Sequence, residues 1–249
     1  MILQKPSNGA SRFYCYKGFH SIVLFAVVDR KYRFIYVNIG TQGRLSDGAV
    51  FNQTEFKKTL MDCKMNLQQP APLPGRTVSV PSVFLSDAAF PIHPNLIKPY
   101  PGTHSKGTAE RIFNYRLSRA RNTVENSFGQ ICSTFRVLRK PLLVKVSTAR
   151  LIGLACVYLH NYLKDSVESA DLYEPPGTYD TVKASGIQED GRWRRDLEDD
   201  TEPQQSFFSL QAEESDDLEI LTNGQAVRDE YRDYFMTPQG RIAMQESRM

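Results

Sequence analysis

Three carboxylates occupy positions at which an α/β protein could bring them together. Asp47 lies in "GRLSDGAVF", at a junction of strand and helix, and Asp87 ends a short strand. Glu125 is the single acidic residue among seven Lys or Arg from Arg111 to Lys140. Carboxylates that converge from strand ends and a helix can hold divalent cations through hard oxygen ligands. Two such ions stabilise the attacking and leaving oxygens of a phosphodiester, so these residues predict metal-dependent chemistry on a phosphate ester.

Each carboxylate also has a purely structural interpretation. Asp47 could cap the N-terminus of a helix, and so could its neighbour Ser46. Asp87 could be a turn residue, and Glu125 could pair with Arg121 one helical turn earlier. Spacing by itself leaves both interpretations open.

Basic residues dominate the first two thirds of the chain. The 249 residues include 31 Lys or Arg and 28 Asp or Glu, but residues 1–164 hold 23 of the basic residues and 7 of the acidic ones. Residues 165–220 reverse this balance, with 4 basic and 17 acidic residues. A basic body of this size favours a polyanionic partner, and nucleic acid is the commonest one. We therefore expect DNA as a partner.

Six cations between Arg111 and Lys140 could contact the phosphate backbone of DNA. They could also simply be exposed to solvent on the outer face of a helix. These candidate DNA contacts are Arg116, Arg119, Arg121, Arg136, Arg139 and Lys140.

The elements that would position these residues alternate between strands and helices. "FHSIVLFAVVDRKYRFIYVNIG" contains two β-branched and aromatic runs, the pattern of a hairpin whose first strand is central in a sheet. "VFLSDAAF" predicts a short strand that ends at Asp87, and the four prolines of "PIHPNLIKPYPG" predict a loop after it. This order indicates an α/β domain.

Three helices are expected in the same region. "DGAVFNQTEFKKTLMDC" predicts one, and "STARLIGLACVYLHNYLK" predicts another that is mostly buried. Between them, an apolar stripe at spacings of three and four predicts a long helix. The stripe consists of Leu117, Ala120, Val124, Phe128, Ile131, Phe135 and Leu138.

Beyond Lys164 the composition changes. Residues 165–220 combine acidic clusters with Pro and Gly and show little periodicity, so we expect an acidic disordered segment there. Residues 221–249 are expected to form a C-terminal tail with one short helix.

Three single residues have structural interpretations. Asp29 falls in the turn of the hairpin, and His160 lies on an apolar helix where a core histidine is the commoner case. Trp193, the only tryptophan, sits among three arginines in the acidic segment and indicates no catalytic role.

Cysteine usage and hydropathy indicate an intracellular protein. The four cysteines are far apart and none forms a C-x-x-C pair, which argues against a zinc site and fits a reducing compartment. The longest apolar run, "SIVLFAVV", has the length of a strand, so no contact with a membrane is expected.

Several of these motifs, taken in order, resemble the transposase superfamily of PIF/Harbinger elements and the nuclease-like proteins domesticated from them. The resemblance covers about residues 12–163 and is carried by "GRLSDGAVF", "FLSDAAFPIHPNLIKPYPG", "ERIFNYRLSRARNTVENSFGQICSTFRVLRKPL" and "LACVYLHNYL". It implies a ribonuclease-H-like mixed sheet flanked by helices over residues 1–164. It also implies an Asp, Asp, Glu catalytic set with Mg²⁺ or Mn²⁺. By motif, Asp87 and Glu125 match catalytic positions, and Asp47 matches a further metal ligand.

The family's first catalytic aspartate, in an Asp-Gly-x-His type sequence, falls before the point that matches "MILQKPSNG". We therefore expect either an N-terminally truncated nuclease domain, which lacks the first strand, or a derivative that has lost a ligand. Two functions follow: a metal-dependent DNA endonuclease or strand transferase, and a catalytically inactive DNA-binding or scaffold protein. The resemblance further implies a nuclear location, alone or shared with the cytoplasm, and a separate Myb-like protein as partner.

Overall fold

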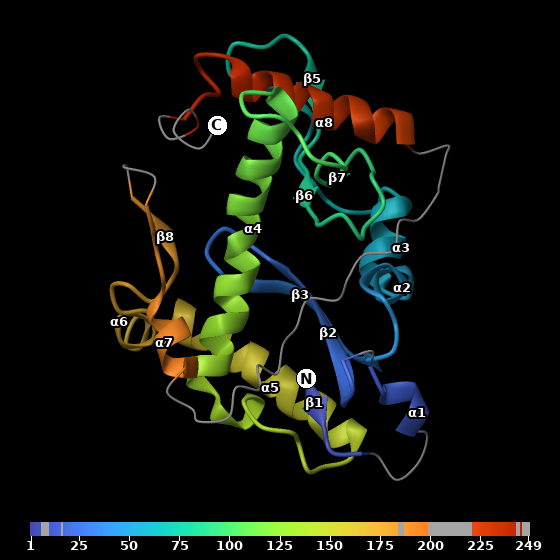
Figure 1. The fold of residues 1–249 in the computed structure, drawn as a ribbon, viewed down its shortest axis with the longest axis vertical. Helices are drawn as coiled ribbons and strands as arrows, with labels where there is room; N and C mark the ends of the chain where they lie inside the picture. The colour runs from blue at the N-terminus through green and yellow to red at the C-terminus, as the bar shows by residue number, and fades with distance from the viewer. Residues whose placement is uncertain (6–9, 16, 184–186, 199–220, 243–244, 246–249) are drawn as a thin grey trace. The chain divides into compact units, whose positions relative to one another are not determined.

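The structure, a computed structural model, describes residues 1–5, 10–15, 17–183, 187–198, 221–242 and 245 (Figure 1). The chain divides into two compact units, which are described separately. Unit 1 comprises Met1–Val50, Asn122–Val182 and the described part of Gln188–Leu210. Unit 2 comprises Phe51–Arg121 and the described parts of Lys183–Ile187 and Gln211–Met249. One long helix, α4 (Ala109–Thr134), gives its first half to unit 2 and its second half to unit 1.

Unit 1 is built on a three-stranded antiparallel sheet in the order β1-β2-β3. The strands of this sheet are β1 (Ile2–Leu3), β2 (His20–Val28) and β3 (Phe34–Gln42). Unit 1 also contains a separate pair of strands, β8 (Thr181–Val182) and β9 (Gln188–Glu189). Besides the second half of α4, the helices of unit 1 are α1 (Ala10–Phe13), η1 (Arg136–Leu138), α5 (Val146–Asp165), α6 (Ala170–Tyr173) and α7 (Arg192–Glu198). The short helix α2 (Asp47–Asn52) spans the boundary with unit 2. The predicted hairpin and the central place of its first strand are confirmed.

The hairpin turn depends on Asp29. Its Oδ1 accepts hydrogen bonds from the backbone N–H groups of Lys31 and Arg33, at 2.8 and 3.0 Å, and Tyr32 adopts a φ of 62°. A carboxylate that closes a turn in this way allows a left-handed residue within it. The structural interpretation of Asp29 is therefore confirmed.

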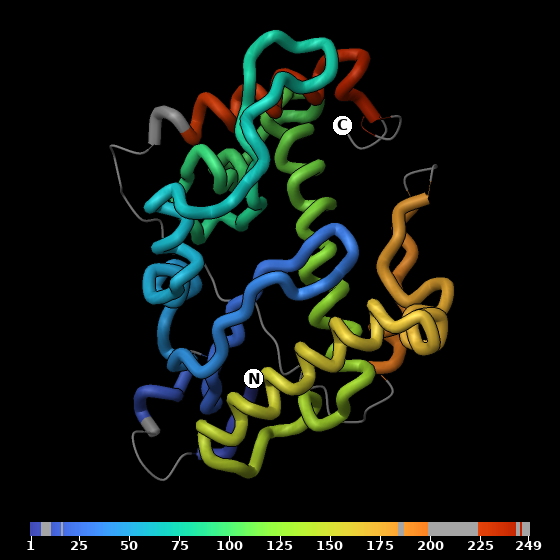
Figure 2. The backbone as a smooth tube through the Cα atoms, turned by 180° about the vertical axis from the view of Figure 1, so that it is seen from behind, coloured from blue at the N-terminus to red at the C-terminus, as the bar shows by residue number. Residues whose placement is uncertain are grey.

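The core of unit 1 lies between the hairpin, α4 and α5. Ile22, Ile39, Ile131 and Val157 are buried in it, and α5 packs against β3 (Figure 2). The opposite face of α5 is open: the exposed side chains include Leu151, Tyr158, Leu159 and Tyr162. The prediction that this helix is mostly buried is therefore wrong for its outer face. Among the described residues, every helix is too short or too polar to cross a membrane.

The described part of the acidic segment forms packed structure. Residues 166–183 and 187–198 contain α6, β8, β9 and α7, and Trp193 is 7% exposed. The prediction of disorder is therefore not confirmed for these residues, and 199–220 lie outside the described part of the chain. The described part of this segment contains the aromatic residues Tyr173, Tyr179 and Trp193, which supply apolar surface for packing that the acidic average composition concealed.

Unit 2 contains short strands, two helices and the first half of α4. Its elements are α3 (Glu55–Met61), β4 (Ala71–Pro72), β5 (Ser79–Val80), β6 (Phe84–Leu85), β7 (Leu96–Ile97) and α8 (Leu221–Met236). β4 pairs with β5 antiparallel, and β6 pairs with β7 parallel. The side chains of Phe113 and Leu117 on α4 pack with Tyr231 and Phe235 of α8, which is the helix expected in the C-terminal tail.

Two boundaries in this region differ from the sequence expectations. The helix expected after Ser46 is broken, because Thr54 accepts a hydrogen bond from the N–H of Lys57 and starts α3 as a new helix. The strand expected to end at Asp87 ends at Leu85, and the proline-rich loop after it contains β7. A mixed α/β class is confirmed, whereas a single ribonuclease-H-like sheet stays a prediction.

Candidate active site

Glu125 lies in the half of α4 that belongs to unit 1. The apolar stripe of this helix buries Ile131, while Glu125 is exposed beside the buried Asn126. Arg194 of α7 pairs with Asp180 and Asp190, and its pKa is raised chiefly by its hydrogen bonds to Asp180, with a smaller contribution from the negative charge of Glu125. Glu125 is therefore a surface carboxylate next to a buried asparagine.

The residues that follow Glu125 fix this turn of the helix. Oδ1 of Asn126 accepts hydrogen bonds from Nε1 of Trp193 at 2.8 Å and from the N–H of Asp180 at 2.9 Å. A Cβ at Gly129 would lie 2.2 Å from an indole carbon of Trp193, so only glycine allows this approach. Sequence reasoning missed Asn126 and Trp193, although a lone tryptophan among arginines and a glycine on a helix were visible signals.

Asp87 lies two residues beyond β6 in unit 2. Its Oδ1 accepts a hydrogen bond from the N–H of Ala89 at 2.9 Å, which is the geometry of a turn residue. Its Oδ2 lies 3.5 Å from a terminal guanidinium nitrogen of Arg121. Asp87 thus makes the hydrogen bond of a turn residue, its catalytic role stays a prediction, and Arg121, which could have paired with Glu125, pairs with Asp87.

Asp47 is the first residue of α2. Ser46 caps this helix, because its Oγ accepts from the N–H of Ala49 at 3.4 Å and its carbonyl accepts from the N–H of Val50 at 2.9 Å. A half-buried carboxylate in the first turn, as at Asp47, is stabilised by the helix dipole. Of the two capping residues that the sequence allowed, the structure selects Ser46.

The six candidate DNA contacts fall into two groups. Three of them make contacts with other groups of the protein. Arg121 pairs with Asp87, as above. The guanidinium of Arg116 lies 3.7 Å from the ring centre of Phe235 and donates to the carbonyl of Gly240, and burial lowers its pKa. Arg139 donates its Nε to the carbonyl of Cys132 at 3.0 Å and so caps the end of α4.

The remaining three candidates differ in exposure. Arg136 and Lys140 are exposed on unit 1, whereas Arg119 is half-buried on unit 2. The exposed pair is therefore the part of the predicted DNA surface that a phosphate backbone could reach in unit 1.

A metal set of three side chains is not formed within either unit. Among the described residues, no three His, Cys, Asp or Glu side chains of one unit lie together as ligands. Asp47 and Glu125 belong to unit 1 and Asp87 to unit 2. The expected approach of Asp87 to Glu125 therefore stays a prediction.

Comparison with known proteins identifies the family. The family model described as "DDE superfamily endonuclease" matches residues 1–161. The chain is 28% identical over 158 residues to the Arabidopsis thaliana protein named "Protein ALP1-like", an alignment that covers 63% of this chain and 38% of that protein. The chain thus spans less than half the length of this relative. No solved structure gives a significant match. Because the family model covers well over half of the 249 residues, and both Asp87 and Glu125 lie within it, the chain belongs to the DDE superfamily of endonucleases.

Proposed function

We propose that this chain is the nuclease domain of a Harbinger-type, metal-dependent DNA endonuclease or strand transferase. The observation that supports this proposal best is the family match over residues 1–161, which includes Asp47, Asp87 and Glu125. In this proposal Asp87 and Glu125 are catalytic, and all three carboxylates are ligands. The domain would have a ribonuclease-H-like sheet, act in the nucleus and work with a separate Myb-like protein.

The chemistry of the donor set fits a hard divalent cation, because all three side chains offer carboxylate oxygens. When bound, Mg²⁺ or Mn²⁺ would stabilise the charge that develops on a phosphodiester during attack by water or a 3′-hydroxyl. The protein contributes orientation: the N–H of Ala89 fixes one oxygen of Asp87 and leaves the other turned toward Arg121.

The cations of unit 1 have a different role in this proposal. Exposed Arg136 and Lys140 would contact phosphates without regard to base sequence. Such contacts release counterions, so binding of the chain to duplex DNA should weaken steeply as salt is raised.

A plasmid-nicking assay with Mg²⁺ or Mn²⁺ tests the catalytic assignment. The comparison includes the 249-residue chain, a version extended by an Asp-Gly-x-His segment, and Glu125→Gln in whichever form nicks DNA. Glu55→Gln is the matched control, because Glu55 is an exposed acid whose surface ion pair with Lys58 contributes little. Nicking that Glu125→Gln abolishes and Glu55→Gln retains supports the proposal.

Two outcomes would contradict it. Nicking that survives Glu125→Gln would make this glutamate an ordinary helix residue. Salt-sensitive DNA binding without nicking by either form would favour the inactive DNA-binding or scaffold protein.

A further inference from the structure

The outer face of α5 carries a continuous apolar stripe. Leu151, Ala155, Tyr158 and Tyr162 are exposed at spacings of four, three and four residues, and exposed Leu159 lies beside them. Residues with these spacings share one side of a helix. The opposite side of the same helix packs on β3, and in Figure 2 the helix, drawn in yellow, lies along the outside of unit 1. α5 is therefore apolar on both of its sides.

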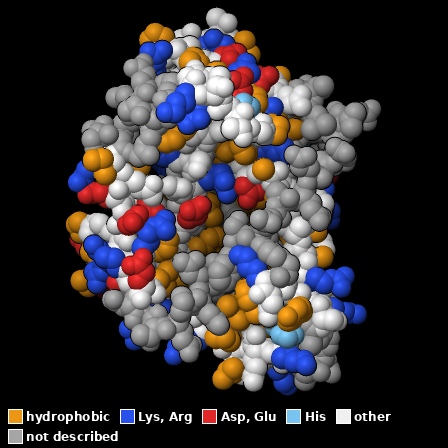
Figure 3. Space-filling model, viewed as in Figure 1, with side chains coloured by type: hydrophobic (Ala, Val, Ile, Leu, Met, Phe, Trp, Pro, Cys, Tyr) orange, Lys and Arg blue, Asp and Glu red, His pale blue; other side chains and the backbone are white. Residues whose placement is uncertain are grey.

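The stripe carries no charged side chain. Between Arg150 and Lys164 the sequence of α5 contains no Asp, Glu, Lys or Arg. The surface of unit 1 is different elsewhere: in Figure 3 acidic and basic side chains alternate over α6, α7 and β8, at the left of the view. Single exposed apolar side chains are ordinary, but a contiguous patch of them marks a surface that binds another molecule.

The size of the stripe suits a specific but weak contact. Leu151, Tyr158 and Tyr162 are 65%, 69% and 67% exposed, and Leu159 is 48% exposed. These fractions correspond to roughly 500 Å² of surface on one copy, so a symmetric contact would bury on the order of 1,000 Å² in total, the lower limit for a specific interface.

The order of side chains along the stripe is complementary to itself. The midpoint between Ala155 and Tyr158 is also the midpoint between Leu151 and Tyr162. A two-fold axis at this point would set two α5 helices antiparallel, with the same patch of both copies in contact. Small Ala155 would then lie opposite the partner's Tyr158, and Leu151 opposite the partner's Tyr162. Each large aromatic ring would thus meet a smaller side chain.

The two ends of the stripe carry opposite charges. Arg150 is exposed, and the side chain of Asp165 is 59% exposed at 3.3 Å from Arg33. The 15 residues between Arg150 and Asp165 place them about 60° apart around the helix axis, on the same flank of the stripe. In the antiparallel arrangement, Arg150 lies about 3 Å along the axis from the partner's Asp165, an offset that an arginine side chain spans. The symmetry creates this pair twice.

We propose that the outer face of α5 is a homodimer interface, in which two copies of this chain pack α5 against α5 in antiparallel orientation with Ala155 and Tyr158 at the centre. A helix of a different protein would require neither the symmetric order of the side chains nor the opposite charges of Arg150 and Asp165. A second copy of the chain is therefore the occupant that these observations favour. The inference uses only α5 and does not depend on the proposed nuclease function.

Sedimentation equilibrium of the full chain measures the association. We expect a monomer–dimer equilibrium with a dissociation constant on the order of 10 µM, because the buried area is small. Tyr158→Glu should raise this constant at least about tenfold, since it places a carboxylate at the desolvated centre of the contact. Val78→Glu is the matched control: Val78 is 54% exposed, belongs to unit 2, and its substitution should leave the constant unchanged.

Two outcomes of this experiment would overturn the inference. One is a chain that stays monomeric up to about 200 µM, which would leave the face of α5 to a different protein. The other is a dimer that Tyr158→Glu leaves intact, which would place the contact elsewhere.

Exchange of the end charges tests the antiparallel arrangement. Arg150→Glu and Asp165→Lys should each raise the dissociation constant about threefold, because like charges then face each other at both ends. An equimolar mixture of the two variants should associate about as tightly as the unsubstituted chain. In the mixed dimer the new glutamate faces the new lysine, and the remaining Arg150 and Asp165 face each other. Thermal unfolding of each variant checks that it is folded. A mixture that associates no better than the separate variants overturns the inference.

Discussion

The hydroxyl of Tyr173 lies 2.7 Å from Nδ1 of His160, and the carbonyl oxygen of Tyr32 lies 2.8 Å from Nε2 of the same ring. A carbonyl oxygen only accepts, so Nε2 carries the proton and the Tyr173 hydroxyl donates to Nδ1. His160 is therefore a neutral, fully buried residue with both nitrogens satisfied. The structural interpretation of this histidine is confirmed.

The buried His160 should make unit 1 sensitive to acid. Burial lowers its pKa to about 4, with a smaller contribution from the charge of Lys164. An unfolded chain binds a proton to this histidine below pH ~6.5, so its stabilising contribution is present above that pH and lost as the pH falls toward 4. The loss should be on the order of 3 kcal/mol. Urea unfolding from pH 7 to 4 should show it, and His160→Gln should remove it. An identical pH dependence for Tyr162→Phe, an exposed position on the same helix, is the expected control.

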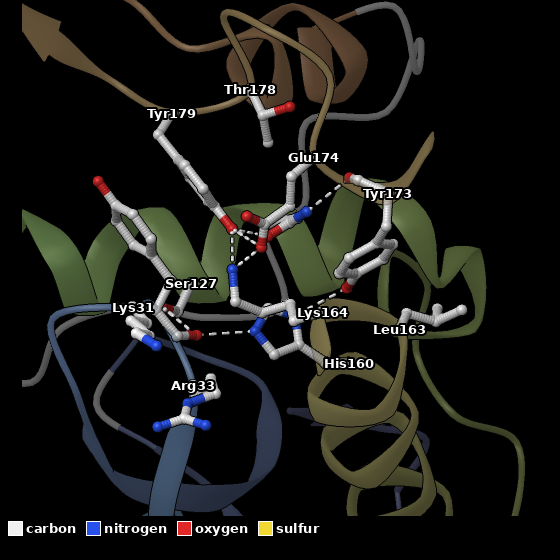
Figure 4. A network of polar contacts seen from close by, with 12 residues as sticks. Lys31, Arg33, Ser127, His160, Leu163, Lys164, Tyr173, Glu174, Thr178 and Tyr179 are labelled. Atoms are coloured by element: carbon white, nitrogen blue, oxygen red, sulfur yellow. Dashed lines mark hydrogen bonds and ion pairs between the residues drawn. The ribbon is translucent and has the colours of Figure 1, made fainter. Parts of the chain in front are cut away.

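Removal of the Glu174 charge should destabilise unit 1. The side chain of Lys164 is 4% exposed and contacts Glu174 and Tyr179 (Figure 4). Glu174→Gln removes the carboxylate that pairs with the buried ammonium group and leaves, among the described residues, only the electrostatic contributions of Asp29 and Asp165, which should lower the free energy of unfolding by about 2–3 kcal/mol. Glu168→Gln, an exposed acid nearby, should change it by less than about 0.5 kcal/mol. Equal effects of the two substitutions would show that the ion pair of Lys164 and Glu174 contributes nothing to the free energy of unfolding.

A methyl group at Gly129 should loosen the docking of α7 on α4. Gly129→Ala would place a Cβ 2.2 Å from Trp193, and overpacking of this kind costs about 1–3 kcal/mol. Trypsin cleavage after Arg192, Arg194 and Arg195 should accelerate, whereas Ser118→Ala at an exposed position of α4 should not change it. In a Trp193→Leu background, Gly129→Ala should cost less, because the smaller side chain leaves room. A full cost in that background would place the clash elsewhere.

Two arginines of the basic segment should separate folding from DNA binding. Arg116→Ala should destabilise unit 2 by about 1–2 kcal/mol, because its guanidinium stacks on Phe235 and donates to Gly240. Arg136→Ala should leave stability unchanged and lower DNA affinity with a smaller salt dependence, since its side chain is exposed. Thermal unfolding and fluorescence anisotropy with a labelled duplex measure the two effects. Reversed effects would contradict the assignment of the exposed arginine to the DNA surface.

The sequence by itself determined the features that depend on neighbours along the chain. Two runs of β-branched and aromatic residues predicted the hairpin with its central first strand, and spacings of three and four predicted the helix that carries Glu125. The order of the short motifs around Asp87 and Glu125 pointed to the DDE superfamily, and the family match confirms it. Hydrophobic periodicity and turn formation depend on residues that are close in the sequence, so they can be predicted without the tertiary structure.

Only the tertiary structure decided which distant groups meet. Trp193 and Asn126 are 67 residues apart, and the acidic composition around Trp193 predicted disorder rather than a partner for α4. The guanidinium of Arg116 stacks on Phe235, and that of Arg139 donates a hydrogen bond to the end of α4. In the sequence, both residues resemble surface cations. The composition of a segment is an average over all its residues. The buried indole of Trp193, whose N–H is hydrogen-bonded, stabilises the docking of its segment on α4 at one point. Such pairing depends on which surfaces the folded chain brings together, and the linear pattern does not contain that information.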